Sequence, residues 1–187
     1  MKANVIRAPG KSGLESGLTL RDLIRQIVDK HHAFLHAELP ALDQLAAKVA
    51  RESTIGTAPL VKLQQAVERL RREAELQMRK EEAILFPAIS ELEATVEAGG
   101  RLNPSPLGSV SNLSRILGQD HWKTARVLAE IREMTGNYQQ GPGDHPAIPV
   151  LFQRLGDLTV QMWEHLYLEN NVLFPRAMMV EQENANE

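Results

Sequence analysis

The sequence predicts an all-α protein folded as a four-helix bundle. Four long stretches carry apolar residues at helical spacing, as Leu20, Leu23, Ile24 and Ile27 do at the start of the first. Segments containing glycine or proline separate these stretches, and none of the chain alternates apolar and polar residues over a useful length as a strand does. Four long helices joined by three loops are typical of a bundle.

The first two helices carry start signals. Thr19, followed three residues later by Asp22, resembles a capping box at the start of the first helix. Pro40 interrupts the apolar pattern of that helix, which predicts a kink or a break. Thr57, with Pro59 in the turn that follows, predicts the N-cap of the second helix.

The remaining boundaries follow from glycines and prolines. Gly99 and Gly100 predict the end of the second helix near residue 98, and the segment 101–108, with two prolines, predicts a loop. The third helix then runs to about residue 135, and the loop 136–146 precedes a fourth helix that starts near Ala147.

The length suits one sizeable domain. The chain has 187 residues and a mass of 20.9 kDa, with 43% hydrophobic and 24% charged residues, which are ordinary values for a globular protein. We expect a flexible N-terminal arm at residues 1–17, the bundle at residues 18–181 and a polar tail at residues 182–187.

Composition also narrows the classes of function. The net charge of −3 and the pI of about 6.1 argue against nucleic acid or an anionic membrane as the main partner. No apolar run is long enough for a membrane span, and no secretory signal is recognisable, so we expect a cytoplasmic protein. The absence of cysteine excludes disulfides, thiolate catalysis and cysteine-ligated metal sites. A metal ion must therefore bind to His, Asp or Glu.

An internal repeat carries the chemistry. Residues 81–87 read Glu-Glu-Ala-Ile-Leu-Phe-Pro, and residues 169–175 read Glu-Asn-Asn-Val-Leu-Phe-Pro. His165 lies four residues before the second motif, and Gln77 lies four residues before the first. His32 precedes Glu81 by 49 residues and His121 precedes Glu169 by 48, so the chain consists of two copies of one unit.

The spacing predicts a metal site inside the bundle. Side chains four residues apart share one face of a helix, so His165 and Glu169 can reach the same ion. Two such helix pairs, related by a pseudo-twofold axis, would direct all six residues at a common interior. A carboxylate can bridge two cations, and imidazole with carboxylate suits iron, manganese or zinc. The alternative is a polar core without metal, but buried carboxylates and histidines are costly without a cation.

These residues resemble a known family. His31-His32, Lys80-Glu81-Glu82 before Ala-Ile-Leu-Phe-Pro, Asp120-His121, and His165 with the motif from Glu169 to Arg176 are similar to hemerythrin-like (HHE cation-binding) domains over about residues 19–180. The resemblance is greatest to the di-iron proteins that repair iron centres, which restore iron–sulfur clusters after nitric oxide or oxidative damage. It implies a left-handed up-down-up-down bundle with a non-haem, oxo-bridged di-iron site.

The resemblance also implies the ligands. By it, His32, Glu81, His121, His165 and Glu169 bind iron, and the two glutamates bridge. His32 and His165 would then serve one metal, and His121 would stay on the other.

The sequence departs from the family pattern in three places. The family has His where this chain has Gln77, usually has another His near Ser53, and often has a Cys-containing domain before the bundle, which we expect this chain to lack. An amide oxygen is a poorer iron ligand than imidazole. We therefore expect two iron positions, of which the one beside Gln77 is weak or empty, with zinc or manganese as other metals that suit the site.

Further polar candidates lie close to the motifs in sequence. We expect His31 to lie behind the ligands or on the surface, and His145 to be exposed. We also expect His36 to be exposed, with a proton donor or an extra ligand as the alternative. Glu82 should face away from the site, and Glu52 is an alternative ligand in place of the missing His near Ser53. The aromatic residues beside the ligands are expected to pack, and they could also form a hydrophobic lid: Phe86, Trp122, Trp163 and Phe174.

Three functions remain open, and so does whether the protein is an enzyme. The first is an iron protein of the repair type, which stores and donates iron to an iron–sulfur client or handles nitric oxide. Its open coordination position would take O2, nitric oxide or peroxide. The second is a non-catalytic sensor or carrier of oxygen, nitric oxide or iron. The third is a metal-poor bundle that binds a partner, and Gln77 is the residue that separates the three.

Overall fold

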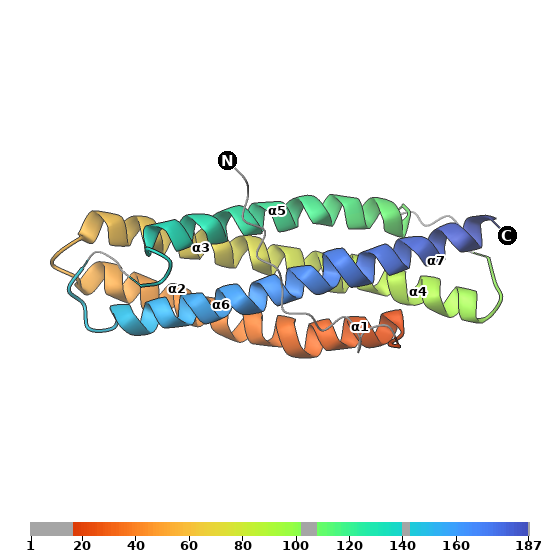
Figure 1. Ribbon diagram of the computed structural model, residues 1–187, viewed down its shortest axis with the longest axis horizontal. Coiled ribbons are helices and arrows are strands. Elements are labelled where there is room, and N and C mark those ends of the chain that lie inside the picture. Colours follow the sequence, from red (N-terminus) through yellow and green to blue (C-terminus); the bar gives the residue numbers. More distant parts are fainter. Residues whose placement is uncertain (1–16, 102–107, 140–142, 187) are drawn as a thin grey trace.

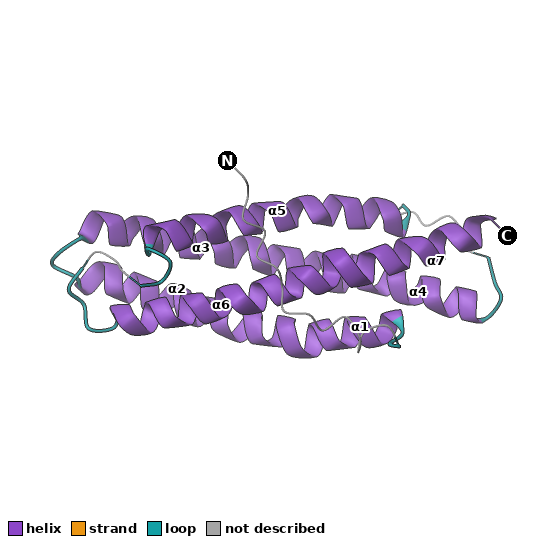
Figure 2. Cartoon of the chain, viewed as in Figure 1, coloured by secondary structure: helices purple, strands orange, loops and turns teal. Residues whose placement is uncertain are grey.

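The chain forms four long antiparallel helices in the computed structural model, which describes residues 17–101, 108–139 and 143–186 (Figure 1). Three of the helices contain a short π-helical turn, labelled η. In chain order the elements are α1 (Leu20–Gln26), η1 (Ile27–His32), α2 (Ala33–Glu52), α3 (Thr57–Lys80), η2 (Glu81–Leu85), α4 (Phe86–Glu97), α5 (Val110–Met134), α6 (Ile148–Leu168), η3 (Glu169–Leu173) and α7 (Phe174–Asn186). The described residues contain no strand (Figure 2), so the prediction of an all-α four-helix bundle is confirmed.

Several predicted helix ends are confirmed. Thr19 Oγ1 accepts a hydrogen bond from the backbone N–H of Asp22 (3.1 Å), and the Asp22 carboxylate accepts one from Thr19 N–H (3.4 Å), which completes the capping box. After α4, Gly99 takes a φ of +66°, and the N–H of Gly100 bonds to the carbonyl of Thr95 (2.9 Å). These are the features of a Schellman motif, in which glycine accepts the left-handed conformation that ends the helix.

One predicted helix start is wrong, and one helix continues through a proline. The N-cap of α3 is Gly56, with a φ of +69°, and Thr57 is already the first helical residue. Of the kink or break predicted at Pro40, the break does not occur, and α2 runs from Ala33 to Glu52 through it. Proline removes only one backbone N–H from the ladder, and its neighbours Leu39 and Leu42 are fully buried and hold the helix in the core.

Other expected segments lie partly outside the described residues. This applies to the arm expected at residues 1–17, except Gly17, and to most of the loop expected at residues 101–108. The segment expected as a polar tail is helical as far as Asn186.

Carboxylates that cap helices repeat the duplication seen in the sequence. Glu93 accepts hydrogen bonds from the first two backbone N–H groups of α1 (2.6 and 3.0 Å), and Glu181 accepts them from the first two of α5 (2.7 and 2.9 Å). Glu93 lies 12 residues after Glu81, and Glu181 lies 12 residues after Glu169. Each half of the chain therefore fixes its first helix to its second in the same way, as a pseudo-twofold arrangement requires.

The core consists of two apolar clusters with a polar layer between them. One cluster, which includes Leu39, Leu70 and Leu158, joins α2, α3, α5 and α6. The other, which includes Leu23 and Ile89, joins α1, α4, α7 and the first half of α5. Along each long helix, the residues between the two clusters are polar and buried, which places the candidate site at the middle of the bundle.

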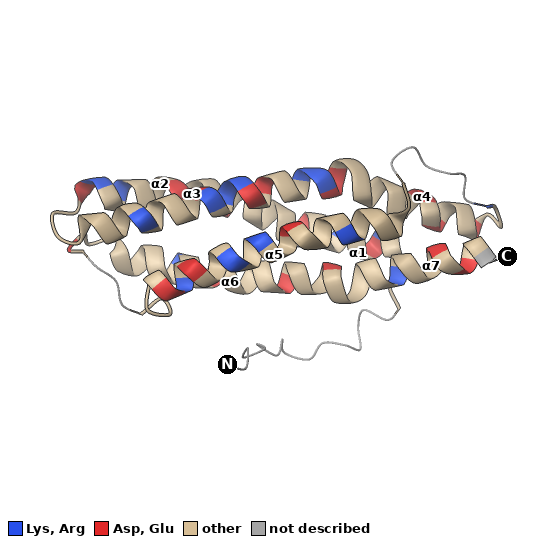
Figure 3. Ribbon diagram, turned by 90° about the horizontal axis from the view of Figure 1, so that it is seen from above, with Lys and Arg blue, Asp and Glu red and all other residues tan. Residues whose placement is uncertain are grey.

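The outer surface of the bundle carries charges of both signs. Figure 3 shows Lys and Arg interspersed with Asp and Glu along the helices. None of the described helices combines the length and the apolar character that crossing a membrane requires.

Candidate metal centre

The polar layer contains all six residues that the repeat predicts. His32, Gln77, Glu81, His121, His165 and Glu169 are each at most 4% exposed. They come from η1, α3, η2, α5, α6 and η3, so every long helix contributes. Their role as metal ligands is a prediction, but the structure brings them together.

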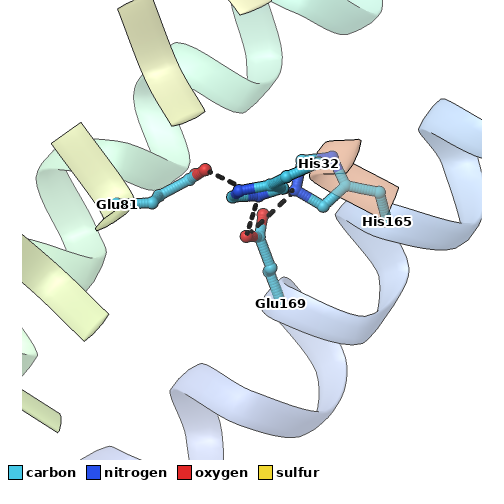
Figure 4. A group of neighbouring side chains, drawn as sticks. All are labelled: His32, Glu81, His165 and Glu169. Carbon is cyan, nitrogen blue, oxygen red and sulfur yellow. Dashed lines mark hydrogen bonds and ion pairs between the residues drawn. The ribbon is translucent and has the colours of Figure 1, made fainter. Parts of the chain in front are cut away.

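The first half of the centre contains two imidazoles and two carboxylates. His32 Nε2 lies 3.1 Å from His165 Nε2 and 3.5 Å from Glu81 Oε2. His165 Nε2 lies 3.0 Å from Glu169 Oε1. One ligand atom from each of these four residues lies within 4.8 Å of the others, and Figure 4 shows the four side chains converging. We call this group the His32–His165 position.

The second half of the centre contains one imidazole and the amide. His121 Nε2 lies 3.1 Å from Glu81 Oε1 and 3.3 Å from Glu169 Oε2. Gln77 Nε2 donates a hydrogen bond to Glu81 Oε1 (3.1 Å). We call this group the His121–Gln77 position. Each glutamate presents one oxygen to each position, which is the arrangement that a bridging carboxylate needs.

The donor atoms fit a cation. Glu81 Oε2 and both oxygens of Glu169 are buried without a hydrogen-bond partner among the described residues, although imidazole nitrogens lie close to them. The contact of 3.0 Å between His165 Nε2 and Glu169 Oε1 therefore has ion-pair distance without hydrogen-bond alignment. Buried polar atoms are normally paired, so carboxylate oxygens that converge without pairing fit a cation.

The electrostatics of the layer point the same way. Burial works against charge on His32, but Glu169, Glu81 and Glu82 outweigh it and raise the pKa of His32. His121 behaves likewise, since Glu81 and Glu169 outweigh its burial and raise the pKa of that imidazole. Burial alone would raise the pKa of Glu169, yet the histidines around it lower that pKa well below the usual range. The layer thus stabilises positive charge, supplied by protons or by a metal ion.

The outer nitrogens of two imidazoles have matched partners. His32 Nδ1 lies 2.6 Å from Glu82 Oε1, and His121 Nδ1 lies 2.9 Å from Asn170 Oδ1. Glu82 and Asn170 each follow directly after a central glutamate. A partner on the outer nitrogen fixes the tautomer, so that Nε2 presents its lone pair to the centre. The expectation that Glu82 faces away is therefore wrong.

The π-helical turns explain this geometry. η2 begins at Glu81 and η3 begins at Glu169, and in each the backbone N–H five residues later bonds back to the glutamate carbonyl. Such π turns occur often at functional sites, and at this one Glu81 lies in the centre while Glu82 contacts His32. Pro87 and Pro175 lack an N–H at the next residue, where the α-helical ladder is already interrupted. The repeated Leu-Phe-Pro motif is thus the sequence signal for these turns.

The amide of Gln77 is oriented by its neighbours. Its oxygen accepts a hydrogen bond from the buried hydroxyl of Thr124 (3.2 Å), and its nitrogen faces Glu81. An ionised carboxylate only accepts hydrogen bonds, so the amide must turn its N–H toward Glu81. Gln77 would have to rotate its oxygen inward to bind a metal, and this orientation favours a role as hydrogen-bond donor.

Aromatic rings close two sides of the layer. Phe86 stacks on His32 with ring centroids 5.6 Å apart, and Phe174 stacks on His121 at 5.7 Å. Trp122 and Trp163 are 63% and 42% exposed. The expected packing role holds for the two phenylalanines, whereas the tryptophans lie largely on the surface.

The other histidines divide into three environments. His31 is fully buried and stacks on His165 at 6.1 Å, so it lies behind a centre residue and not on the surface. Its burial, together with nearby Lys30, lowers the pKa of His31 to about 4. His36 is on the surface, as expected, with its side chain 47% exposed. His145 was expected to be exposed, but its side chain is only 10% exposed. It pairs with Glu52 (3.2 Å) and accepts a hydrogen bond from the backbone N–H of Ala147.

The end of the first helix lies far from the centre, so the alternative of Glu52 as a ligand is wrong. Glu52 pairs with His145 at the end of the bundle where α2 turns into α3, and it is not part of the centre. Ser53 follows directly, 21 residues beyond His32, which is about 30 Å along a helix at about 1.5 Å per residue. A histidine at this position could not reach the centre, so the missing histidine leaves the donor set unchanged.

Comparison with known proteins agrees with this geometry. Residues 23–103 match the hemerythrin HHE cation binding domain. The chain is 32% identical over 159 residues to the iron–sulfur cluster repair protein YtfE of Edwardsiella ictaluri, and 28% identical to that of Escherichia fergusonii. Each match covers 85% of this chain and 66% of the relative, so the chain spans just under two thirds of the length of these relatives. The chain therefore carries a hemerythrin HHE cation-binding domain and is homologous to the iron–sulfur cluster repair proteins over most of its length.

Proposed function

We propose that this protein binds ferrous iron in the polar layer and donates it for the repair of iron–sulfur clusters. The observation that carries the proposal is the buried set of two imidazoles and two carboxylates, in which Glu81 Oε2 and both Glu169 oxygens lack hydrogen-bond partners among the described residues. Nitrogen and oxygen donors of this kind suit iron. The repair function is taken from the name of the relatives. In this proposal the protein transfers the ion and performs no redox step itself.

We further propose that the two positions bind iron unequally. The His32–His165 position offers two imidazoles, and Glu82 adds a carboxylate behind one of them. The His121–Gln77 position offers one imidazole, with neutral Asn170 behind it and an amide N–H toward the shared carboxylate. One iron would therefore be held firmly and the other weakly or not at all. Two irons, and O2, nitric oxide or peroxide as a ligand, remain predictions.

Iron content and iron transfer together test the function. The chain would be loaded anaerobically with Fe2+, desalted and assayed for iron per chain. It would then be mixed with an iron–sulfur enzyme whose cluster peroxide has damaged, together with a thiol reductant that supplies the electron an oxidised cluster needs to rebind Fe2+. Recovery of that enzyme's activity would be followed. Glu169→Ala should abolish both binding and recovery, because Glu169 contacts both positions. Glu164→Ala, on the exposed face of the same long helix, is the matched control and should change neither.

The outcomes separate the alternatives. Iron binding with recovery of the enzyme supports repair. Iron binding without recovery favours a sensor or carrier of one ion. The Gln77 amide turns its N–H toward Glu81, which also favours a single ion. A wild-type chain that binds no iron refutes the proposal and leaves partner binding as the remaining function.

A further inference from the structure

The centre needs a route for its ion. All its donor residues are at most 4% exposed, so an iron ion cannot reach them without passing other side chains. A protein that donates iron must also release it at a useful rate. The question is which residues connect the centre with solvent.

One chain of polar contacts runs from the centre to the surface. His32 Nε2 faces the centre, whereas its Nδ1 lies 2.6 Å from Glu82 Oε1. The same Glu82 oxygen lies 3.7 Å from His36 Nε2. The side chains of Glu82 and His36 are 39% and 47% exposed, so this pair is open to solvent while it touches a centre residue.

The separation of the two surface atoms suits a shared cation. Metal–nitrogen and metal–oxygen bonds of about 2.1 Å place two donors of one ion at most about 4.2 Å apart. The observed 3.7 Å between His36 Nε2 and Glu82 Oε1 falls within that limit. Imidazole and carboxylate are also the donor types of the centre, so an ion that moves inward keeps similar ligands.

The second half of the chain provides an internal comparison. Asn170 takes the place of Glu82 behind His121, and it is exposed like Glu82. The residue four positions after His121 is Ala125, where His36 stands four after His32. The second half therefore lacks both the carboxylate of Glu82 and the imidazole of His36, although the helices that surround the position are duplicated.

We propose that His36 and Glu82 form a surface docking site for a divalent cation, through which ferrous iron enters and leaves the His32–His165 position. This inference rests on the proposed binding of iron in the centre. Glu82 receives the ion with His36, and its contact with His32 places the ion beside the first imidazole of the centre. His36 is a positioning residue for iron transfer and not part of the centre itself.

The rate of iron exchange tests the proposal. Wild type and His36→Gln would be loaded anaerobically with Fe2+, and loss of iron to an excess of a chromogenic ferrous chelator would be followed by absorbance. The rate of uptake by the metal-free chain would be measured as well. His145→Gln, which removes the imidazole of another His–Glu pair at the end of the bundle, is the matched control. Equilibrium iron content is measured for all three proteins.

We expect His36→Gln to slow both uptake and release by about tenfold, because a donor lost from the path raises the barrier equally in both directions. Its equilibrium iron content should equal that of wild type, and His145→Gln should match wild type throughout. Rates of His36→Gln within about twofold of wild type would overturn the proposal, as would a lower equilibrium iron content in this variant. Absence of iron from wild type itself would instead refute the proposed function.

Discussion

Gln77→His replaces the one residue that breaks the symmetry of the centre. The substitution places an imidazole at the position that corresponds to His165 in the second half of the chain. The amide nitrogen that it replaces lies 3.1 Å from Glu81 Oε1. The His121–Gln77 position would then have two imidazoles and two carboxylate oxygens, like its counterpart. We expect the iron content to rise from about one to about two ions per chain, because imidazole binds iron better than an amide.

The metal-free variant should be less stable than wild type. Gln77 is 1% exposed and makes two hydrogen bonds, with Glu81 and Thr124. Each contributes about 0.5–1.5 kcal/mol, so their loss lowers the free energy of unfolding by about 1–3 kcal/mol. In a domain of this size that corresponds to a fall in Tm of roughly 2–12 °C. Iron at about 100 times its Kd should restore about 2.7 kcal/mol and bring the Tm back.

Elemental analysis and thermal unfolding with and without Fe2+ measure both effects. Gln77→Leu is the control, since it loses the same hydrogen bonds but adds no ligand, and its iron content should stay at the wild-type value. A folded Gln77→His chain with unchanged iron content would refute the reasoning. So would two firmly bound irons in wild type, because the amide would then be no obstacle.

Three further predictions concern the scaffold. Glu181→Gln removes the negative charge at the first N–H groups of α5 and should lower the free energy of unfolding by about 0.5–2 kcal/mol in denaturant titrations, and an unchanged midpoint would contradict the capping role. Gly143→Ala adds a Cβ 2.7 Å from Leu60 at a φ of +111° and should destabilise the chain by about 1–3 kcal/mol or more; equal stability would show that the loop adjusts freely. Asp144 accepts hydrogen bonds from the hydroxyl and N–H of Thr54, which lower its pKa below 3.8. A lowered pKa stabilises the fold above pH 3.8 and loses that effect as the pH falls, so Asp144→Ala should lower the Tm at pH 7 but progressively less in acid; a pH-independent difference would contradict this.

The duplicated architecture allows one half to act as a control for the other. Helix caps, stacked phenylalanines and partners of the outer nitrogens all occur twice at matched positions. Among the positions where the halves differ are Gln77, Glu82 and His36. Under the proposals above, these three differences act in the same direction, because each would make the His32–His165 position the better or more accessible site for a cation.

Some features of the centre could not be predicted from helical geometry. In an ideal α-helix, His31 and Glu82 would point about 100° away from their neighbours His32 and Glu81. Both neighbouring pairs lie in π-helical turns, and in the structure His31 is buried while Glu82 contacts His32. The environments of His145 and Glu52 were missed for another reason, since their pairing joins residues 93 positions apart.

The sequence by itself determined the four helices and the six residues of the polar layer. The periodicity of apolar residues predicts the helices, and glycines predict where they end. The matched spacing of Gln77 with Glu81 and of His165 with Glu169 predicts that each pair faces the centre, because residues i and i+4 share a helix face. Only the tertiary structure decided which atoms meet. The pairing of Glu82 with His32 joins helices 50 residues apart, and the turn of the Gln77 amide depends on Thr124 from α5. Such contacts depend on how side chains from different helices approach one another, and no local pattern in the sequence encodes that approach.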